Sequence, residues 1–180
     1  MKKSILIFVM ILGVLFITGC NKKEEKNNIP DNKENEMVEV KKISIIDEKS
    51  NSRPYAIVIN NFPSAVKVQT GLQDAYMIYE IPVEGGMSRS LAFYKDKVTA
   101  KVGTVRSARH NFLDYVLEND AIFVHFGWSH YAQADIPSLG INNINGLYDT
   151  PFWRENPEGL ATEHTAYTGL DKLIEVAKNK

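Results

Sequence analysis

The sequence contains a single cysteine, Cys20, among its 180 residues. A disulfide within the chain and a metal site built on paired cysteines are therefore both excluded. The sequence also lacks a Gly-x-x-x-x-Gly-Lys phosphate loop, a Gly-x-Gly-x-x-Gly turn and a His-Glu-x-x-His motif. These absences weigh against nucleotide hydrolysis and zinc proteolysis. We predict no metal and no cofactor, because the scattered acids could hold Mg²⁺ only if the fold gathered several of them: Glu80, Glu84, Asp114, Asp120 and Asp135.

The first nineteen residues have the organisation of an export signal. Two lysines follow Met1, an apolar stretch runs from Ile5 to Ile17, and Thr18-Gly19 supplies small residues after it. Thirteen helical residues span roughly 20 Å, which is short of the roughly 30 Å hydrocarbon core of a bilayer. We therefore predict that residues 1–19 are a cleaved signal peptide and not a permanent membrane span.

Cys20 directly follows Ile17-Thr18-Gly19, and this placement resembles the bacterial lipoprotein signal. The resemblance implies that the Cys20 thiol receives a diacylglyceryl group and becomes the first residue of the mature chain. Two or more acyl chains hold a domain stably on a membrane, whereas one does not. The expected location is the extracytoplasmic face of the cell membrane. The alternative is an unmodified cysteine that lies near the signal by chance.

Residues 20–53 are predicted to be a flexible linker. The segment is rich in Lys, Glu and Asn and has few large apolar residues before Val38, so it cannot bury enough surface to offset its ordering entropy. A flexible chain of this length has a reach of about 30 Å. Its charges of both signs largely cancel, which argues against a polybasic membrane patch.

Removing residues 1–19 deletes two lysines and no acid and changes the formal net charge from −1 to −3, so we predict no nucleic-acid partner.

Residues 54–180 are long enough for one domain with a sizeable core. Tyr55 to Asn60 is apolar on both faces and predicts a covered central strand. Tyr76 to Val83 and Ser88 to Tyr94 flank Glu84-Gly85-Gly86 and predict a hairpin. Further strands are predicted over Lys101 to Val105 and Ala121 to Trp128.

Helical patterns alternate with the later strands. Ser107 can cap a helix that ends near Asn119, a second helix is predicted over Ser129 to Leu139, and a third over Leu170 to Lys180. The hairpin requires antiparallel pairing, whereas crossover helices favour parallel pairing. The predicted fold class is therefore α/β, a layered domain with a mixed β-sheet flanked by helices.

Three arginines interrupt segments that otherwise resemble core: Arg89, Arg106 and Arg109. Arg106 and Arg109 lie on either side of the predicted helix start, where unpaired N–H groups and the helix dipole already carry partial positive charge. A compensating anion is therefore expected nearby. It is either a ligand phosphate or carboxylate held by the guanidinium groups, or an internal partner, for which Glu80 and Glu84 are the candidates. We expect ligand binding at Arg89, Arg106, Arg109 and Glu84.

The histidines give weaker signals. His125 lies within an apolar strand and is included among the candidate ligand-binding residues, although a hydrogen-bonded core histidine is the more common case. Ser129 and His130 follow a strand end, where α/β sheets often form sites, but no spacing marks a serine triad. His164 lies in a polar segment and is expected to be a surface residue.

Several motifs, in order along the chain, resemble the YerB-type lipoprotein family, also called the DUF3048 domain. They are Asn61-Phe62-Pro63, Gln69-x-Gly71-Leu72, Tyr79-Glu80-x-Pro82-Val83-Glu84-Gly85-Gly86-x-x-Arg89, Val105-Arg106-Ser107-Ala108-Arg109, Asp120-Ala121-Ile122-x-Val124-His125 and His164-x-x-Tyr167-Thr168. Asn60 and Thr104 depart from the Asp and Pro expected in many members, and the first departure weakens any metal-binding acid at that position. The resemblance implies a bacterial envelope lipoprotein without an established activity. It also implies a second, C-terminal domain, so we expect residues 54–180 to be an N-terminal domain and the chain to be a fragment or a truncated gene product.

Two functions from different classes follow. The first is an envelope lipoprotein that binds an anionic cell-wall polymer, a lipid pyrophosphate or a protein partner through the surface from Glu84 to Arg109. The second rests on a remote likeness to the LytR-CpsA-Psr phosphotransferases. It is an enzyme that transfers or cleaves phosphate-linked envelope polymers, in which the arginines would stabilise developing negative charge. The second function needs an acid and a divalent ion close to the arginines.

Overall fold

The structure is a computed structural model that describes residues 46–47 and 49–178. The predicted signal peptide, the lipidation of Cys20 and most of the predicted linker lie outside the described residues. Among the described residues, no helix is both long and apolar enough to cross a bilayer.

The main sheet has five strands in the order β2-β3-β1-β5-β6. Its strands are β1 (Tyr55–Asn60), β2 (Met77–Pro82), β3 (Ser88–Tyr94), β5 (Ile122–His125) and β6 (Asn143–Asn145). β3 pairs antiparallel with both β1 and β2, whereas β1–β5 and β5–β6 are parallel. The sheet is therefore mixed, as predicted, and the β2–β3 hairpin turns at the 3-10 turn η3 (Glu84–Gly86).

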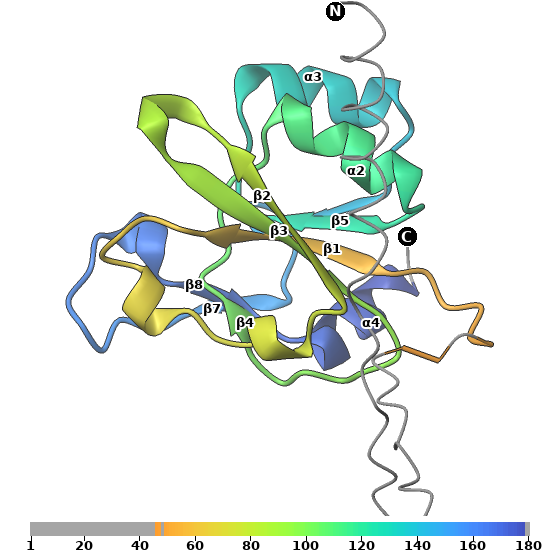
Figure 1. The fold of residues 1–180 in the computed structure, drawn as a ribbon, viewed down its shortest axis with the longest axis horizontal. Coiled ribbons are helices and arrows are strands. Elements are labelled where there is room, and N and C mark those ends of the chain that lie inside the picture. Colours follow the sequence, from red (N-terminus) through yellow and green to blue (C-terminus); the bar gives the residue numbers. More distant parts are fainter. Residues whose placement is uncertain (1–45, 48, 179–180) are drawn as a thin grey trace, which may run out of the picture. The chain divides into compact units, whose positions relative to one another are not determined.

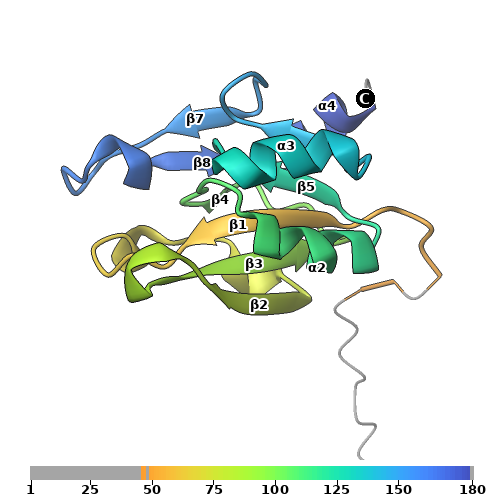
Figure 2. The ribbon, with the colours of Figure 1, turned by 90° about the horizontal axis from the view of Figure 1, so that it is seen from above.

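A second sheet of three strands has the order β4-β8-β7. It consists of β4 (Val102–Gly103), β7 (Phe152–Arg154) and β8 (Ala166–Thr168). The helices are α2 (Leu113–Glu118), α3 (His130–Ser138) and α4 (Leu170–Ala177), and the other 3-10 turns are η1 (Val66–Val68), η2 (Leu72–Asp74), η4 (His110–Phe112) and η5 (Thr162–His164). In Figure 1, α2 and α3 lie above the main sheet, and the second sheet and α4 lie below it. Figure 2 shows the same layers from above, with α2 and α3 in front of the strands.

All six residues of β1 are buried, because the strand lies between two hydrophobic clusters. Ala56 and Val58 face the cluster beneath α2 and α3, together with Phe112, Phe123 and Ile136. Its alternate residues face the cluster shared with β4 and α4, which contains Tyr55, Ile57, Ile59, Val102, Leu170 and Leu173. Apolar side chains on both faces are what a covered central strand requires.

One predicted helix boundary is wrong. The helix was expected to start directly after Ser107. The structure instead has the 3-10 turn η4 from His110, followed by α2 from Leu113, and Arg109, the residue before η4, is extended. The amide of Ala108 donates to the Gly127 carbonyl (2.9 Å) and its carbonyl accepts from the Ser129 amide (3.0 Å). Since these groups form β-type bonds, they cannot start a helix. The helix-terminus argument therefore does not apply to Arg106.

Candidate functional site

The candidate site lies where β1 and β5 end. The extended segment Thr104–Ala108 crosses these two strand ends, because the Arg106 amide donates to the Val58 carbonyl and the Phe126 amide donates to the Arg106 carbonyl, both at 2.9 Å. Loops beyond the carboxyl ends of strands often form binding sites in α/β sheets. The fold thus places Arg106 at such an edge.

Arg89 enters the same region from β3, where it lies opposite Asn60 of β1. The residue is 6% exposed. Its Nη1 donates to the Ser107 carbonyl and lies 3.3 Å from the Ser107 hydroxyl. Burial, together with the neighbouring charges of Arg109 and Arg106, lowers the pKa of Arg89 to about 10. Within the described part of the chain Arg89 forms no ion pair with a carboxylate, so its charge is only partly compensated.

Arg106 has a similar environment. Its Nη1 donates to the Glu163 carbonyl at 3.2 Å, whereas its Nε is buried and has no hydrogen-bond partner among the described residues. Burial lowers the pKa of Arg106, the nearby Glu163 carboxylate opposes this effect, and Arg109 adds to it. A buried guanidinium N–H without a partner is costly, and an oxygen ligand would relieve that cost.

Arg109 differs from the other two arginines because it has an internal acid. Its Nε lies 2.6 and 2.9 Å from the two carboxylate oxygens of Glu84. The hydrogen bond from Arg109 lowers the pKa of Glu84. The internal partner considered from the sequence is therefore present for Arg109. Glu80, the other candidate partner, instead accepts from the Ser88 hydroxyl.

The three arginines Arg89, Arg106 and Arg109, hereafter the arginine cluster, thus form one ion pair among the described residues, between Arg109 and Glu84. Arg89 donates to the carbonyl of Ser107, which lies between Arg106 and Arg109 in the chain, so the three residues belong to one region of the fold. In the described residues, no group of three or more His, Cys, Asp or Glu side chains is arranged to hold a metal ion.

A buried Asn60–His164 pair lies beside the cluster. Asn60 Oδ1 accepts from the Phe62 amide (3.1 Å), so its Nδ2 faces His164 Nδ1 (2.8 Å) as a donor. His164 must then be the neutral tautomer with its proton on Nε2. Its ring also stacks on Phe62 at 4.8 Å. The expectation of a surface histidine is wrong, because η5 packs against the end of β1 and leaves His164 buried.

This pair makes stability depend on pH. Burial, followed by the charge of Arg106, lowers the pKa of His164 below its ordinary value of 6.5. The folded state therefore binds this proton more weakly than the unfolded state does. We expect the contribution of His164 to the free energy of unfolding to be complete above about pH 6.5 and to fall as the pH decreases toward the folded pKa. Denaturation across this window should give a shallower pH slope for His164→Gln, and identical slopes would contradict the assignment.

A second polar network at the end of β1 was not predicted. Gln69 Nε2 donates to the Asn60 carbonyl (2.6 Å) and to Asn61 Oδ1 (2.9 Å). Asn61 also bonds the Ser90 hydroxyl at 2.9 Å. The network fixes the loop after β1 to β3, the strand that carries Arg89. The sequence signal was the Asn60-Asn61 pair directly after an apolar strand.

His125 lies away from these contacts, in the interior. Its Nδ1 is bonded to the Gly127 carbonyl (2.8 Å) and its Nε2 to the Asn143 side-chain amide (3.0 Å). Both ring nitrogens are thus engaged, which is the arrangement of a hydrogen-bonded core histidine. Ser129 caps α3 by accepting from the Ala132 amide, and His130 is exposed and packs edge-on against Tyr131.

The sequence model of the DUF3048 N-terminal domain, described as a protein of unknown function, matches residues 43–180. The protein named "Putative lipoprotein YerB" of Bacillus subtilis (strain 168) is 31% identical over 182 residues, covering 100% of this chain and 53% of that protein. The crystal structure of the YerB protein from Bacillus subtilis matches with a TM-score of 0.65 and 37% identity, covering 71% of this chain and 43% of that chain. The chain thus spans about half the length of these relatives. These matches confirm the resemblance predicted from the sequence motifs, and the chain belongs to the DUF3048 N-terminal domain family.

Proposed function

We propose that this domain is held on the outer face of a bacterial membrane through Cys20 and binds an anionic envelope ligand at Arg89 and Arg106. The anchoring is supported by the position of Cys20 behind an apolar signal and by the name of the relative, a lipoprotein. On that side of the membrane, the anions available to the site are phosphate or carboxylate groups of envelope polymers and lipids. A protein partner that presents such groups would use the same chemistry.

The observation that carries the proposal is the unequal pairing of the arginine cluster. Arg109 is neutralised by Glu84, whereas the hydrogen bonds of Arg89 and Arg106 within the described residues go to carbonyl and hydroxyl oxygens of Ser107 and Glu163. Removing charges from water without an opposite charge is unfavourable. An anion between the two guanidinium groups would supply that charge and take the unused N–H groups.

Binding without chemistry is favoured over phosphoryl transfer. The enzyme hypothesis requires acids near the arginines to act as base or metal ligands. Glu84 is already engaged by Arg109, and Glu80 accepts a hydrogen bond from Ser88. Glu163, the acid near Arg106, is exposed. The buried residues of the site are amides, an imidazole and guanidinium groups, which suit recognition of an oxyanion.

The test is thermal stabilisation by inorganic pyrophosphate in wild type, Arg106→Gln and Arg53→Gln. Arg53 forms an ion pair with Asp120 and lies just before β1, whereas Asn60 and the candidate site lie at the other end of that strand. Arg53→Gln therefore removes one positive charge, as Arg106→Gln does, but away from the site. A ligand at about 100 times its Kd adds about 2.7 kcal/mol to the folded state. We expect wild type and Arg53→Gln to be stabilised by several degrees and Arg106→Gln not to respond. An unresponsive wild type, or an equal loss in both variants, would contradict the site.

A further inference from the structure

A cavity of about 280 Å³ lies beside the arginine cluster, between the turn of the β2–β3 hairpin and the start of α3. Arg109 and Glu84 belong to its wall, so the cavity adjoins the proposed anion site. The rest of the wall comes from residues around the end of β2, η4 and the start of α3, and consists of Pro82, Val83, His110, Asn111, Ser129 and Tyr131. The volume is close to the lower limit of about 300 Å³ for small-molecule sites, which suits a single small group.

An exposed aromatic ring forms one side of this cavity. Tyr131 is 68% exposed. Its ring contacts the rings of His110 and His130 at interplanar angles of 70° and 63°, with centroids 5.7 and 5.9 Å apart. These contacts restrict the ring, and its large exposed fraction leaves aromatic surface open to solvent. An ordered, exposed aromatic ring beside a cavity is a surface on which a ligand can pack.

The polar groups of the wall retain capacity for further hydrogen bonds. Arg109 uses Nε for Glu84 and Nη1 for the Ala108 carbonyl (2.9 Å), whereas its Nη2 forms no hydrogen bond within the described residues. The Glu84 side chain is 67% exposed, and its carboxylate has more acceptor positions than the Arg109 N–H fills. Asn111 donates to the Pro82 carbonyl (3.0 Å), but its Oδ1 is buried and has no partner in the described part of the chain. One wall thus offers a charged donor, a charged acceptor and a neutral acceptor.

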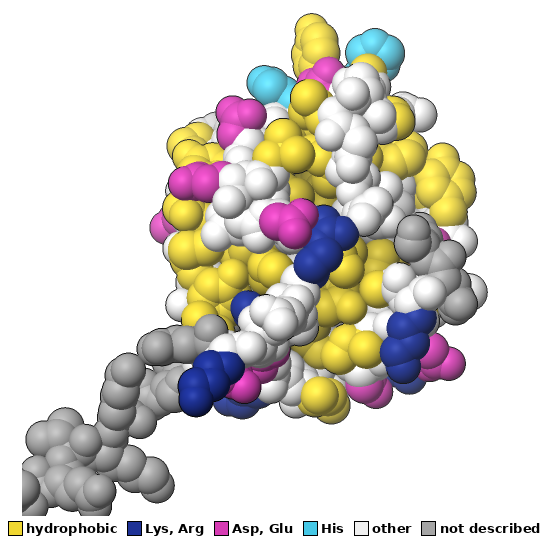
Figure 3. Space-filling view, turned by 90° about the vertical axis from the view of Figure 1, so that its right-hand side faces the viewer, with side chains coloured by type: hydrophobic (Ala, Val, Ile, Leu, Met, Phe, Trp, Pro, Cys, Tyr) yellow, Lys and Arg dark blue, Asp and Glu magenta, His cyan; other side chains and the backbone are white. Residues whose placement is uncertain are grey.

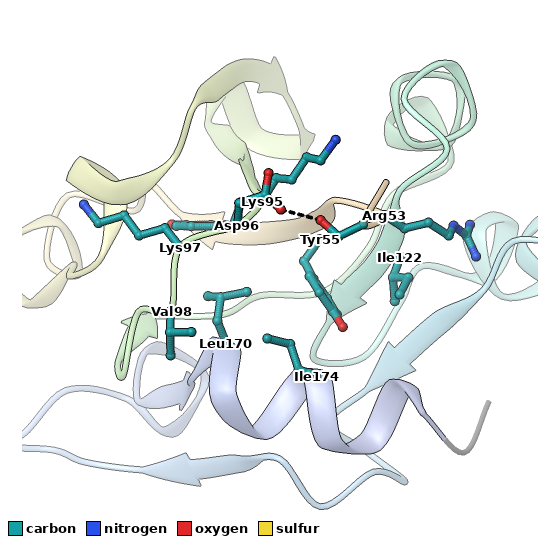
Figure 4. Close-up of a pocket in the computed structure, with 11 residues that line it drawn as sticks. Arg53, Tyr55, Lys95, Asp96, Lys97, Val98, Ile122, Leu170 and Ile174 are labelled. Carbon is teal, nitrogen blue, oxygen red and sulfur yellow. Dashed lines mark hydrogen bonds between the residues drawn. The ribbon is translucent and has the colours of Figure 1, made fainter. Parts of the chain in front are cut away.

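A larger cavity of about 340 Å³ at the amino-terminal end of β1 has the opposite character. In Figure 4 the side chains of Val98, Leu170 and Ile174 gather over α4 below Tyr55, whereas the charged side chains of the rim extend away from them. Figure 3 shows hydrophobic side chains gathered on this face of the domain with charged groups among them. Because the charges point away from an apolar interior, this cavity does not suit a hydrophilic ligand, whereas the cavity beside Arg109 does.

A sugar ring matches both parts of the smaller cavity. Its C–H bonds present a weakly positive, apolar surface that packs against the negative face of an aromatic ring such as Tyr131. Its hydroxyls both donate and accept hydrogen bonds, so neighbouring hydroxyls can bond Arg109 and Glu84 together, and another can donate to Asn111. An acyl chain would instead remove these polar groups from water without replacing their hydrogen bonds. The wall therefore favours a saccharide over a lipid chain.

We infer that this cavity is a saccharide subsite, and that the anion held by Arg89 and Arg106 is the phosphate group of a phosphorylated sugar whose ring packs on Tyr131. The inference rests on the proposed anion site and names the class of ligand that the site takes. One stretch of chain joins the two parts, because Arg89 donates to the Ser107 carbonyl and Arg109, two residues later, lines the cavity. A sugar and the phosphate bonded to it would occupy both parts at once.

Isothermal titration calorimetry on the purified full chain tests the subsite with four probes: glucose 1-phosphate, N-acetylglucosamine 1-phosphate, glycerol 1-phosphate and inorganic pyrophosphate. Glycerol 1-phosphate carries a similar phosphate without a sugar ring, as a lipid headgroup does. We expect wild type to bind at least one of the sugar phosphates about tenfold or more tighter than glycerol 1-phosphate, the effect of one or two added hydrogen bonds. Tyr131→Ala should lose this preference and bind pyrophosphate as wild type does, whereas Tyr131→Phe keeps the ring and should keep the preference.

Tyr148→Ala is the matched control. Tyr148 is 73% exposed and packs near Trp128, with ring centroids 5.8 Å apart, but it does not line the cavity. The variant therefore removes an equally exposed tyrosine ring and should retain the preference for the sugar phosphates.

The outcomes separate this inference from the proposed function. Pyrophosphate binding with no preference for a sugar phosphate, or an equal loss of preference in Tyr131→Ala and Tyr148→Ala, would overturn the saccharide subsite and leave the anion site standing. A Tyr131→Ala variant that binds pyrophosphate and the sugar phosphates equally weakly would also overturn it, because the ring would then act on the anion. If wild type binds neither pyrophosphate nor a sugar phosphate, the inference and the proposed function are both wrong.

Discussion

Replacing Gly71 with alanine is expected to lower the free energy of unfolding by about 2–4 kcal/mol. Gly71 has a φ of +84°, a conformation that L side chains rarely adopt. A Cβ atom there would also lie 2.7 Å from the Lys101 carbonyl oxygen and 2.9 Å from Val102 Cγ2. The backbone at Lys101 and Val102 cannot move away from Gly71, because the adjacent residues Thr70 and Gly103 are joined by two backbone hydrogen bonds of 2.8 and 3.1 Å. Chemical denaturation of the variant measures the loss.

Gly86→Ala is the matched control for this prediction. Gly86 has a similar φ of +70°, but a Cβ atom there would meet nothing within 4 Å. It therefore isolates the cost of the left-handed conformation, about 1–2 kcal/mol. If both variants lose the same free energy, the close approach of Gly71 to β4 has no energetic role.

Replacing Arg89 with methionine is expected to separate stability from binding. The Arg89 guanidinium is buried, forms no ion pair within the described residues and is influenced by the charges of Arg109 and Arg106 more than by Glu84, so the folded state gains little from its charge. Methionine retains most of the volume, and the main loss is the hydrogen bond to the Ser107 carbonyl. We expect the free energy of unfolding to change by less than about 1 kcal/mol, because relief of the buried charge offsets the lost bond.

The same variant should bind pyrophosphate at least about tenfold more weakly, since hydrogen bonds to charged groups contribute about 1.5–3 kcal/mol. Arg89→Lys keeps the charge but loses the planar fork and should retain part of the affinity. Isothermal titration calorimetry and denaturation on the same samples give both quantities. A large loss of stability with unchanged affinity would instead assign Arg89 a purely structural role.

The long, regular elements of the fold could be predicted from the sequence. The strand Tyr55–Asn60 is uniformly apolar, and Ser88–Tyr94 alternates beside a Gly-Gly turn, so both were found with their correct ends. The strands β6, β7 and β8 have three residues each and were missed, because three residues do not establish an alternation. Ser107 was assigned to a helix because propensity favours it as a cap. The pairing of Ala108 with residues beyond β5 overrides that preference.

The candidate site was predictable only in part. Clustered arginines within apolar segments pointed to Arg89, Arg106 and Arg109, and Glu80 and Glu84 were both candidate partners. The sequence could not assign the acid to its arginine, and the structure pairs Glu84 with Arg109. The Asn60–His164 bond joins residues 104 positions apart, so nothing local in the sequence indicates it. His125, selected for its position in a strand, has both ring nitrogens bonded within the core, which only the three-dimensional arrangement reveals.

The central claim is that Arg89 and Arg106 together bind an anion, and a crystal structure of the protein soaked with pyrophosphate tests it most directly. We expect pyrophosphate oxygens about 3 Å from guanidinium nitrogens of both residues, with the Glu84–Arg109 pair intact beside them. Pyrophosphate bound only at other basic side chains, or absent at saturating concentration, would contradict it.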